Sequence, residues 1–269
     1  MDLHLRDRVY LVTGGSRGLG FAAAETLVAE GARVVVSSPR EASAAAAAAR
    51  LAGAAAADSV AWLAADNADV ATPERLLTTA EDRFGRLDGA LVSVGGTPPG
   101  TVATTPDDAW RSSFESVFLG AVRLARLLGT HLTRSGNGPE NGAIAGTGGS
   151  IVFVLASSVR VPLAGLAVSN GLFPGLAGVV KMLAEDLGPS GVRMNGILPV
   201  RIATERVRQL DALSGDPDEV RARKSEDIPL RRYGEPEEFG RVAAFLLSPA
   251  ASYITGAMIP VDGGSIRAI

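Results

Sequence analysis

Short apolar runs alternate with longer segments of helical periodicity along almost the whole chain. Runs that are brief and continuous are typical of strands covered on both faces, and strands that alternate with helices favour a parallel, doubly wound sheet with right-handed crossovers. We therefore predict one α/β domain over residues 1–269, with seven strands at 9–12, 33–37, 60–64, 90–94, 150–155, 193–198 and 258–261. Helices are predicted at 21–30, 39–52, 73–84, 106–132, 166–187, 202–213 and 236–247.

One segment interrupts this alternation, and a second is distinguished by its charge. Residues 134–149 are rich in glycine and asparagine, which predicts an extended loop inserted between a helix and a strand. Residues 205–228 are rich in charge and contain Asp216-Pro217. Because ligands of open α/β sheets bind at the carboxyl ends of the strands, we expect this second segment to form a mobile lid there.

A glycine-rich turn, TGGSRGLG over residues 13–20, connects the first predicted strand to the first helix. In this context Gly14 allows a tight turn, Gly18 lets a pyrophosphate approach the backbone, and Gly20 lets helix and strand pack closely. The helix N-terminus adds free N–H groups and a positive dipole end. The turn predicts dinucleotide binding; a turn that merely needs glycine is the alternative interpretation.

Composition and charge remove several function classes. The 269 residues are 46% hydrophobic and 20% charged, with a net charge of −3, so we expect a globular protein without a nucleic-acid footprint or a polybasic membrane patch. The absence of cysteine excludes disulfides, thiolate metal sites and a cysteine nucleophile, and no metal site is predicted. The N-terminus lacks the apolar core of a signal peptide and no run reaches the length of a membrane span, which predicts a cytoplasmic protein.

Several further motifs follow the glycine turn in order. They are Asp69-Val70, Arg86-Leu87-Asp88, Gly120, Arg193-Met194-Asn195, Pro199, Gly234-Glu235-Pro236-Glu237-Glu238, Tyr253-Ile254-Thr255-Gly256 and Val261-Asp262-Gly263-Gly264. With them the chain resembles the short-chain dehydrogenase/reductase family over essentially its whole length, and looks like the β-ketoacyl-carrier-protein reductase branch. The resemblance implies a Rossmann-type fold, a nicotinamide cofactor, a small carbonyl or hydroxyl substrate, and a homodimer or homotetramer.

The catalytic residues of that family are not found at their expected positions. The family uses Tyr-x-x-x-Lys on the fifth helix, a serine on the fifth strand and an asparagine on the fourth helix. Four residues after the tyrosines of this chain stand Gly14, Glu237 and Ala257, so the tyrosine–lysine motif is absent.

Aligned with the family, the chain places other residue types at these positions. Ser169 occupies the tyrosine position, Phe173 the lysine position and Val117 the asparagine position. The serine position falls on Ala156, and a slip of one residue would place Ser157 there instead.

The resemblance also implies which residues bind the cofactor. Arg17, Ser38 and Arg40 suit a 2′-phosphate, which favours NADP over NAD. Asp69 would contact the adenine, with Asp66 as the alternative, and Thr204 either helps to hold the nicotinamide carboxamide or caps a helix. The complete predicted set is Gly14, Ser16, Arg17, Gly18, Leu19, Gly20, Ser38, Arg40, Asp69, Gly95, Ile202 and Thr204.

Polar residues implied at the substrate end complete the predicted site. Serines would orient the substrate, and the arginines would clamp an acidic group or polarise a carbonyl unless they are ordinary surface residues. The candidates are Ser157, Ser158, Ser169, Arg160 and Arg201. The favoured hypothesis is an NADP-dependent oxidoreductase with an atypical site. A non-redox cyclase, dehydratase or isomerase and an inactive binding or assembly subunit are the alternatives.

Overall fold

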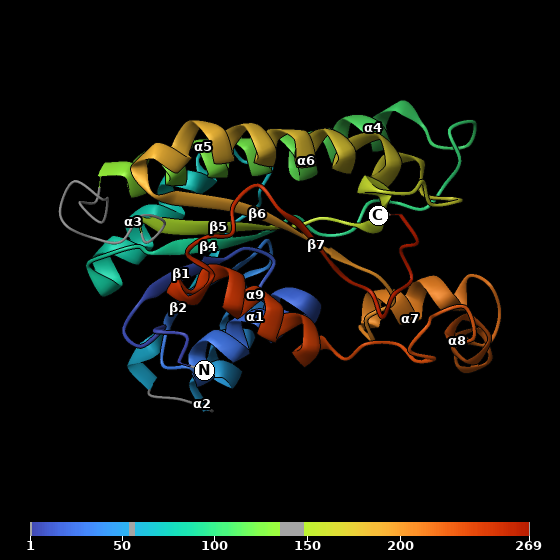
Figure 1. The fold of residues 1–269 in the computed structure, drawn as a ribbon, viewed down its shortest axis with the longest axis horizontal. Helices are drawn as coiled ribbons and strands as arrows, with labels where there is room; N and C mark the ends of the chain where they lie inside the picture. The colour runs from blue at the N-terminus through green and yellow to red at the C-terminus, as the bar shows by residue number, and fades with distance from the viewer. Residues whose placement is uncertain (1, 54–56, 135–147, 269) are drawn as a thin grey trace.

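Seven parallel strands run through the centre of the computed structural model, which describes residues 2–53, 57–134 and 148–268 (Figure 1). Their order across the sheet is β3-β2-β1-β4-β5-β6-β7, and every neighbouring pair is parallel. The strands are β1 (Val9–Val12), β2 (Arg33–Ser38), β3 (Val60–Ala64), β4 (Gly89–Ser93), β5 (Gly149–Val154), β6 (Val192–Pro199) and β7 (Met258–Val261). The predicted seven-stranded α/β fold is confirmed, and strand ends shift by one residue at most.

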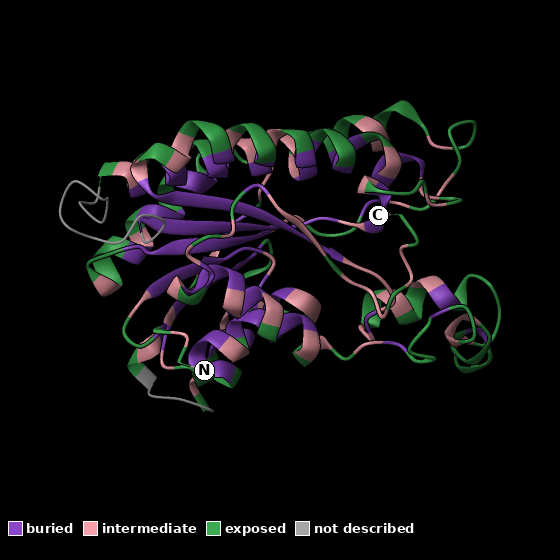
Figure 2. Ribbon diagram, viewed as in Figure 1, coloured by how far each residue is buried: buried purple, intermediate pink, exposed green. Residues whose placement is uncertain are grey.

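Helices cover both faces of the sheet, and the central strands between them are almost completely buried (Figure 2). One face carries α3 (Thr72–Phe84), α5 (Gly120–Arg134) and α6 (Ala167–Leu187), and the other carries α1 (Gly18–Ala29), α2 (Glu41–Gly53) and α9 (Pro236–Leu247) (Figure 1). On α6, Leu172, Leu176 and Val180 repeat every four residues and are buried, as expected of an amphipathic core helix. Each such side chain contributes roughly 1.5–3 kcal/mol through burial.

The strand order reverses direction between β1 and β4. Thr13, directly after β1, fastens the two strand ends, because its hydroxyl donates to the Ser93 carbonyl at 3.0 Å and accepts from the Ser93 amide at 2.9 Å. In open α/β sheets ligands bind outside the carboxyl ends of the strands at such a switch point. The fold thus places the glycine turn after β1 where a ligand is expected.

The helix predicted over residues 106–132 is wrong as a single α-helix. It consists of α4 (Asp107–Ser113), a π-helical segment (Phe114–Leu119) and α5. Wide π turns of this kind are rare and occur frequently at functional sites, and apolar periodicity alone does not reveal them. Val117 lies in the π-helical segment and is buried.

The two irregular segments differ in how far they are described. Most of the loop predicted for 134–149 lies outside the described residues, and only its ends, at Arg134 in α5 and Gly149 in β5, belong to named elements. The predicted lid, residues 205–228, contains α7 (Glu205–Ala212) and α8 (Pro217–Ser225), which lie beyond the sheet at the right of Figure 1. The predicted helix 202–213 therefore begins three residues later than expected.

Within the described residues, α6 and its extension to Ser190 are the one helical stretch that is long and apolar enough to cross a membrane, judged by length and composition. Half of its most apolar window is buried inside the protein. The core helix of a soluble protein has the same properties, which agrees with the packing of α6 on the sheet.

The Arg193-Met194-Asn195 motif has a structural role on β6. Arg193 is buried and donates to the carbonyls of Leu246 and Ser248 at 2.8 and 2.9 Å, while Asn195 donates to the Ile254 carbonyl at 2.8 Å. Burial lowers the pKa of Arg193 to about 10. The motif thus fixes the C-terminal segment to the sheet rather than contributing to a site.

Candidate functional site

The glycine turn has the backbone that its sequence predicts. Gly14 and Gly18 have left-handed φ angles of +59° and +57°, which favour glycine, and a Cβ on Gly20 would lie 2.5 Å from the Gly14 carbonyl oxygen. Helix α1 begins at Gly18, three residues earlier than predicted, so Gly18, Leu19 and Gly20 form its first turn. The amides of a first helical turn have no partners within their helix and are available to an anion.

Two further segments approach this turn. A Cβ on Gly14 would lie 2.9 Å from the Ser93 carbonyl oxygen, which places the end of β4 and the following Gly95 (φ +81°) beside the turn. A Cβ on Gly18 would lie 3.6 Å from the methyl carbon of Thr204. Residues separated by more than a hundred positions therefore meet at the switch point.

Thr204 also caps a helix, which is the alternative role that the sequence predicted for it. It is the N-cap of α7, and its hydroxyl accepts from the Val207 amide at 3.3 Å. The preceding Ile202 is buried, and Ala203 donates to the Gly234 carbonyl at 2.8 Å. The capping interpretation of Thr204 is confirmed, while a contact of Ile202 or Thr204 with a nicotinamide stays a prediction.

Positive charge lies beside the other end of the glycine turn. The Ser16 and Ser38 hydroxyls are 3.2 Å apart, which brings the turn and the end of β2 together. Arg17 and Arg40 are exposed, and neither forms an ion pair with any carboxylate in the described part of the chain. Two exposed arginines within two residues of these serines along the chain suit an anionic group.

The two candidate acids after β3 make similar backbone contacts, but only Asp69 has an ion-pair partner among the described residues, Arg75 at 3.9 Å. Asp69 accepts from the Ala71 amide at 2.9 Å, and Asp66 accepts from the Ala68 amide at 2.9 Å. Both side chains therefore order the turns before α3. A contact of either residue with an adenine stays a prediction.

We call three residues the α6 wall: Ser158 in the turn after β5, and Ser169 and Phe173 on α6. Two hydroxyls of this wall are in mutual contact. The Ser158 and Ser169 oxygens are 3.0 Å apart, and both residues are buried. Phe173, one helical turn after Ser169, is 5% exposed and belongs to the apolar core. No cation of this wall favours an ionised hydroxyl, so the pair can orient an oxygen or relay a proton but is a weak acid.

The neighbouring candidates differ in accessibility. Ser157 is buried, whereas Arg160 is exposed and has no ion-pair partner among the described residues. Asn170, which the sequence analysis missed, binds the loop before α6: its side chain accepts from the Leu163 amide and donates to the Leu163 carbonyl, both at 2.8 Å. An asparagine in a helix that pairs with the preceding loop has no signature in the sequence.

Arg201 is held by a buried carboxylate. It has a left-handed φ of +51°, and its guanidinium lies 3.1 Å from Asp211 on α7. The same Asp211 carboxylate binds Lys224 of α8 at 2.8 Å and accepts from the Tyr233 hydroxyl at 3.0 Å. We call Asp211, Arg201, Lys224 and Tyr233 the lid cluster, because it joins α7 and α8 of the predicted lid to the segment after β6.

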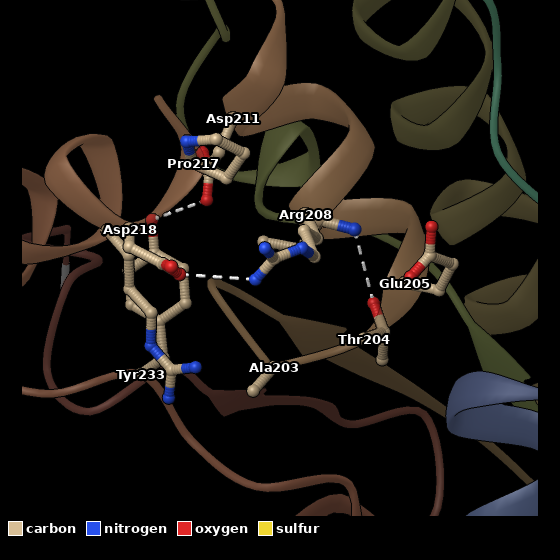
Figure 3. Close-up of a pocket in the computed structure, with 10 residues that line it drawn as sticks. Ala203, Thr204, Glu205, Arg208, Asp211, Pro217, Asp218 and Tyr233 are labelled. Carbon is tan, nitrogen blue, oxygen red and sulfur yellow. Dashed lines mark hydrogen bonds and ion pairs between the residues drawn. The ribbon is translucent and has the colours of Figure 1, made fainter. Parts of the chain in front are cut away.

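Asp211 and Tyr233 of the lid cluster also line a pocket of about 230 Å³ (Figure 3). Charged side chains of both signs line it, among them Arg208, which pairs with Asp218 at 3.1 Å. Burial and the hydrogen bond to Asp211 raise the pKa of Tyr233 to about 12, so its phenol stays protonated at neutral pH. Typical ligand pockets measure about 300–1,000 Å³, so this pocket is too small for a dinucleotide.

Comparison with known proteins identifies the class of this chain. A sequence model described as enoyl-(acyl carrier protein) reductase matches residues 14–265. The 3-oxoacyl-(acyl-carrier-protein) reductase FabG of Vibrio harveyi is 30% identical over 264 residues, which cover 97% of this chain and 98% of that protein.

Solved structures agree. Levodione reductase superposes with a TM-score of 0.88 at 27% identity and covers 98% of this chain and 99% of its own. YwfH, an NADPH-dependent reductase involved in bacilysin biosynthesis, superposes with a TM-score of 0.86 at 25% identity, covering 97% and 99%. The chain belongs to the short-chain dehydrogenase/reductase family, whose members bind NAD(P) and act on small molecules.

Proposed function

We propose that this protein is an NADP-dependent short-chain oxidoreductase that acts on a carbonyl or hydroxyl substrate without the family's tyrosine–lysine pair. The observation that carries the proposal is the glycine turn at the switch point, with Thr204 against Gly18 and the end of β4 against Gly14. A Cβ at Gly14 or Gly20 would collide with backbone, so the sequence retains the close backbone packing that a dinucleotide site needs.

The residues at the turn fit an NADP molecule. The diphosphate would lie on the first amides of α1, and Arg17, Ser38 and Arg40 would hold the 2′-phosphate. When bound, the nicotinamide supplies or accepts the hydride. The NADPH dependence of YwfH supports the same preference.

The chain's own residues would then position the substrate and move a proton. The Ser158–Ser169 pair would orient the substrate oxygen and pass a proton from solvent, with Ser157 beside it and Arg160 at the exposed end. Because neutral serine is a weak acid, catalysis would depend mainly on orientation, which lowers barriers considerably, and we expect slow turnover.

The remaining features of the proposal concern the whole molecule. The chain would act as one domain, with residues 205–228 as a lid over the carboxyl ends of the strands. It would be cytoplasmic and would assemble as a homodimer or homotetramer, as short-chain family members typically do. Arg201 would fix the lid through Asp211 instead of clamping the substrate.

Calorimetric titration with NADPH and NADH tests the cofactor. We expect tighter binding of NADPH, and Arg40→Ala should weaken NADPH binding about tenfold while it leaves NADH unchanged. Arg83→Ala serves as the matched control, because Arg83 pairs with Asp58 and lies outside the proposed site. Failure of the wild-type protein to bind either dinucleotide would refute the proposal.

Transfer of deuterium from labelled NADPH to a panel of carbonyl compounds tests the reaction. Labelled alcohol would support the oxidoreductase. A changed substrate without cofactor oxidation would indicate a non-redox enzyme, and binding without any turnover would indicate a binding subunit.

A further inference from the structure

Arg206, in the first turn of the lid helix α7, differs from the arginines beside it. Arg201 pairs with Asp211 and Arg208 pairs with Asp218, each at 3.1 Å. Arg206 forms no ion pair with any carboxylate in residues 2–53, 57–134 or 148–268. Its charge is therefore not neutralised by the lid.

The Arg206 guanidinium instead reaches the loop after β4. One of its terminal nitrogens donates to the Thr97 carbonyl at 2.8 Å, across 109 positions of sequence. A Cβ on Gly96 would lie 2.9 Å from the Arg206 Nε and 3.4 Å from its Cζ, so the guanidinium lies directly against a glycine backbone. A bulkier residue at position 96 would displace it.

This contact places the Arg206 guanidinium beside the loop after β4, at the switch point of the sheet. Thr204 lies against Gly18 on the β1 side, and Arg206, two residues later, lies against Gly96 on the β4 side. A dinucleotide bound at the glycine turn would therefore lie beside both contacts. Arginine has five N–H donors, of which the Thr97 carbonyl uses one, so the others are available to ribose or phosphate oxygens.

We propose that Arg206 is a cofactor-binding residue that holds the nicotinamide half of the bound dinucleotide and supplies there the positive charge that Phe173 does not provide. Through Arg206, the lid would contact the bound dinucleotide directly. This inference rests on the proposed NADP dependence, and it predicts that the two halves of the cofactor depend on different arginines.

Binding of two ligands by three variants provides the test. Adenosine 2′,5′-bisphosphate carries the adenosine half alone, whereas NADPH carries both halves. We expect Arg206→Ala to weaken NADPH binding about tenfold, because the charge-assisted hydrogen bonds to the nicotinamide half of the dinucleotide are lost. The affinity for adenosine 2′,5′-bisphosphate, which lacks that half, should change by less than about twofold. Arg206→Lys should recover part of the NADPH affinity. Arg208→Ala is the matched control. It should change the affinity for either ligand by less than about twofold, because Arg208 pairs with Asp218.

Each other outcome has a definite meaning. Wild-type protein that binds neither ligand would refute the proposed function and this inference with it. Wild-type binding of NADPH together with unchanged NADPH affinity in Arg206→Ala would refute the inference alone. Equal weakening of both ligands, or an equal loss in Arg208→Ala, would show a distorted lid and would also overturn it. Thermal unfolding of each variant identifies a misfolded protein.

Discussion

The α6 wall contains neither a tyrosine nor a lysine, whereas the lid cluster contains one of each. In the predicted alignment with the family, the wall has a serine and a phenylalanine at the tyrosine and lysine positions, whereas the lid cluster brings Tyr233 and Lys224 onto one carboxylate. The chain has only two lysines and three tyrosines, so the pair in the lid is conspicuous. Yet the Tyr233 hydroxyl donates to Asp211, which together with burial raises its pKa to about 12. A tyrosine and a lysine are catalytic only where their surroundings favour proton transfer.

The largest effect is expected when the α6 wall is made to resemble the family. Phe173→Lys removes a buried aromatic ring and introduces a charge without a partner, so it should cost at least about 3 kcal/mol of unfolding free energy. Phe173→Leu, the apolar control, should cost roughly 1–2 kcal/mol through the lost carbons. Denaturant unfolding measures both. Equal stability of the two variants would mean that this wall already accommodates a cation.

The lid cluster should respond next most strongly. Asp211→Ala removes a carboxylate that is 1% exposed, so Arg201, Lys224 and Tyr233 lose their shared partner. The free energy of unfolding should fall by about 3 kcal/mol. The control Asp218→Ala breaks an exposed pair and should cost less than about 1 kcal/mol. Hydrogen exchange should locate the Asp211→Ala loss in α7 and α8. Unchanged exchange there would show that the cluster does not hold the lid.

The smallest effect concerns pH. Because the pKa of Tyr233 rises from 10.0 to about 12 on folding, its contribution to stability is complete below pH 10 and is lost as the pH rises through 12. The stability difference between wild type and Tyr233→Phe should therefore be constant at neutral pH and shrink above pH 10. Tyrosinate absorbance of both proteins reports the titration. A Tyr233 component that appears near pH 10 would place the phenol in water instead of against Asp211.

The sequence was most informative where a short segment determines its own structure. The strand positions and the glycine turn follow from local apolar runs and from glycines that need left-handed φ angles, and Gly14, Gly18 and Gly20 have the backbone that their spacing predicts. It was less informative about helix 106–132, because no residue type marks the point where i→i−4 hydrogen bonds give way to the i→i−5 bonds of a π-helical segment. The roles of the predicted site residues stay predictions.

The sequence by itself determined the parallel sheet, the glycine turn and the absence of Tyr-x-x-x-Lys, since each depends on residues that are adjacent or periodic along the chain. Only the tertiary structure decided which partners the polar residues have. It joined Ser158 to Ser169, Arg201 to Asp211, and Arg206 to Thr97 across 109 positions. The reason is that charge and hydrogen-bond capacity belong to a residue type, whereas burial and the nearest partner are fixed when distant segments pack together.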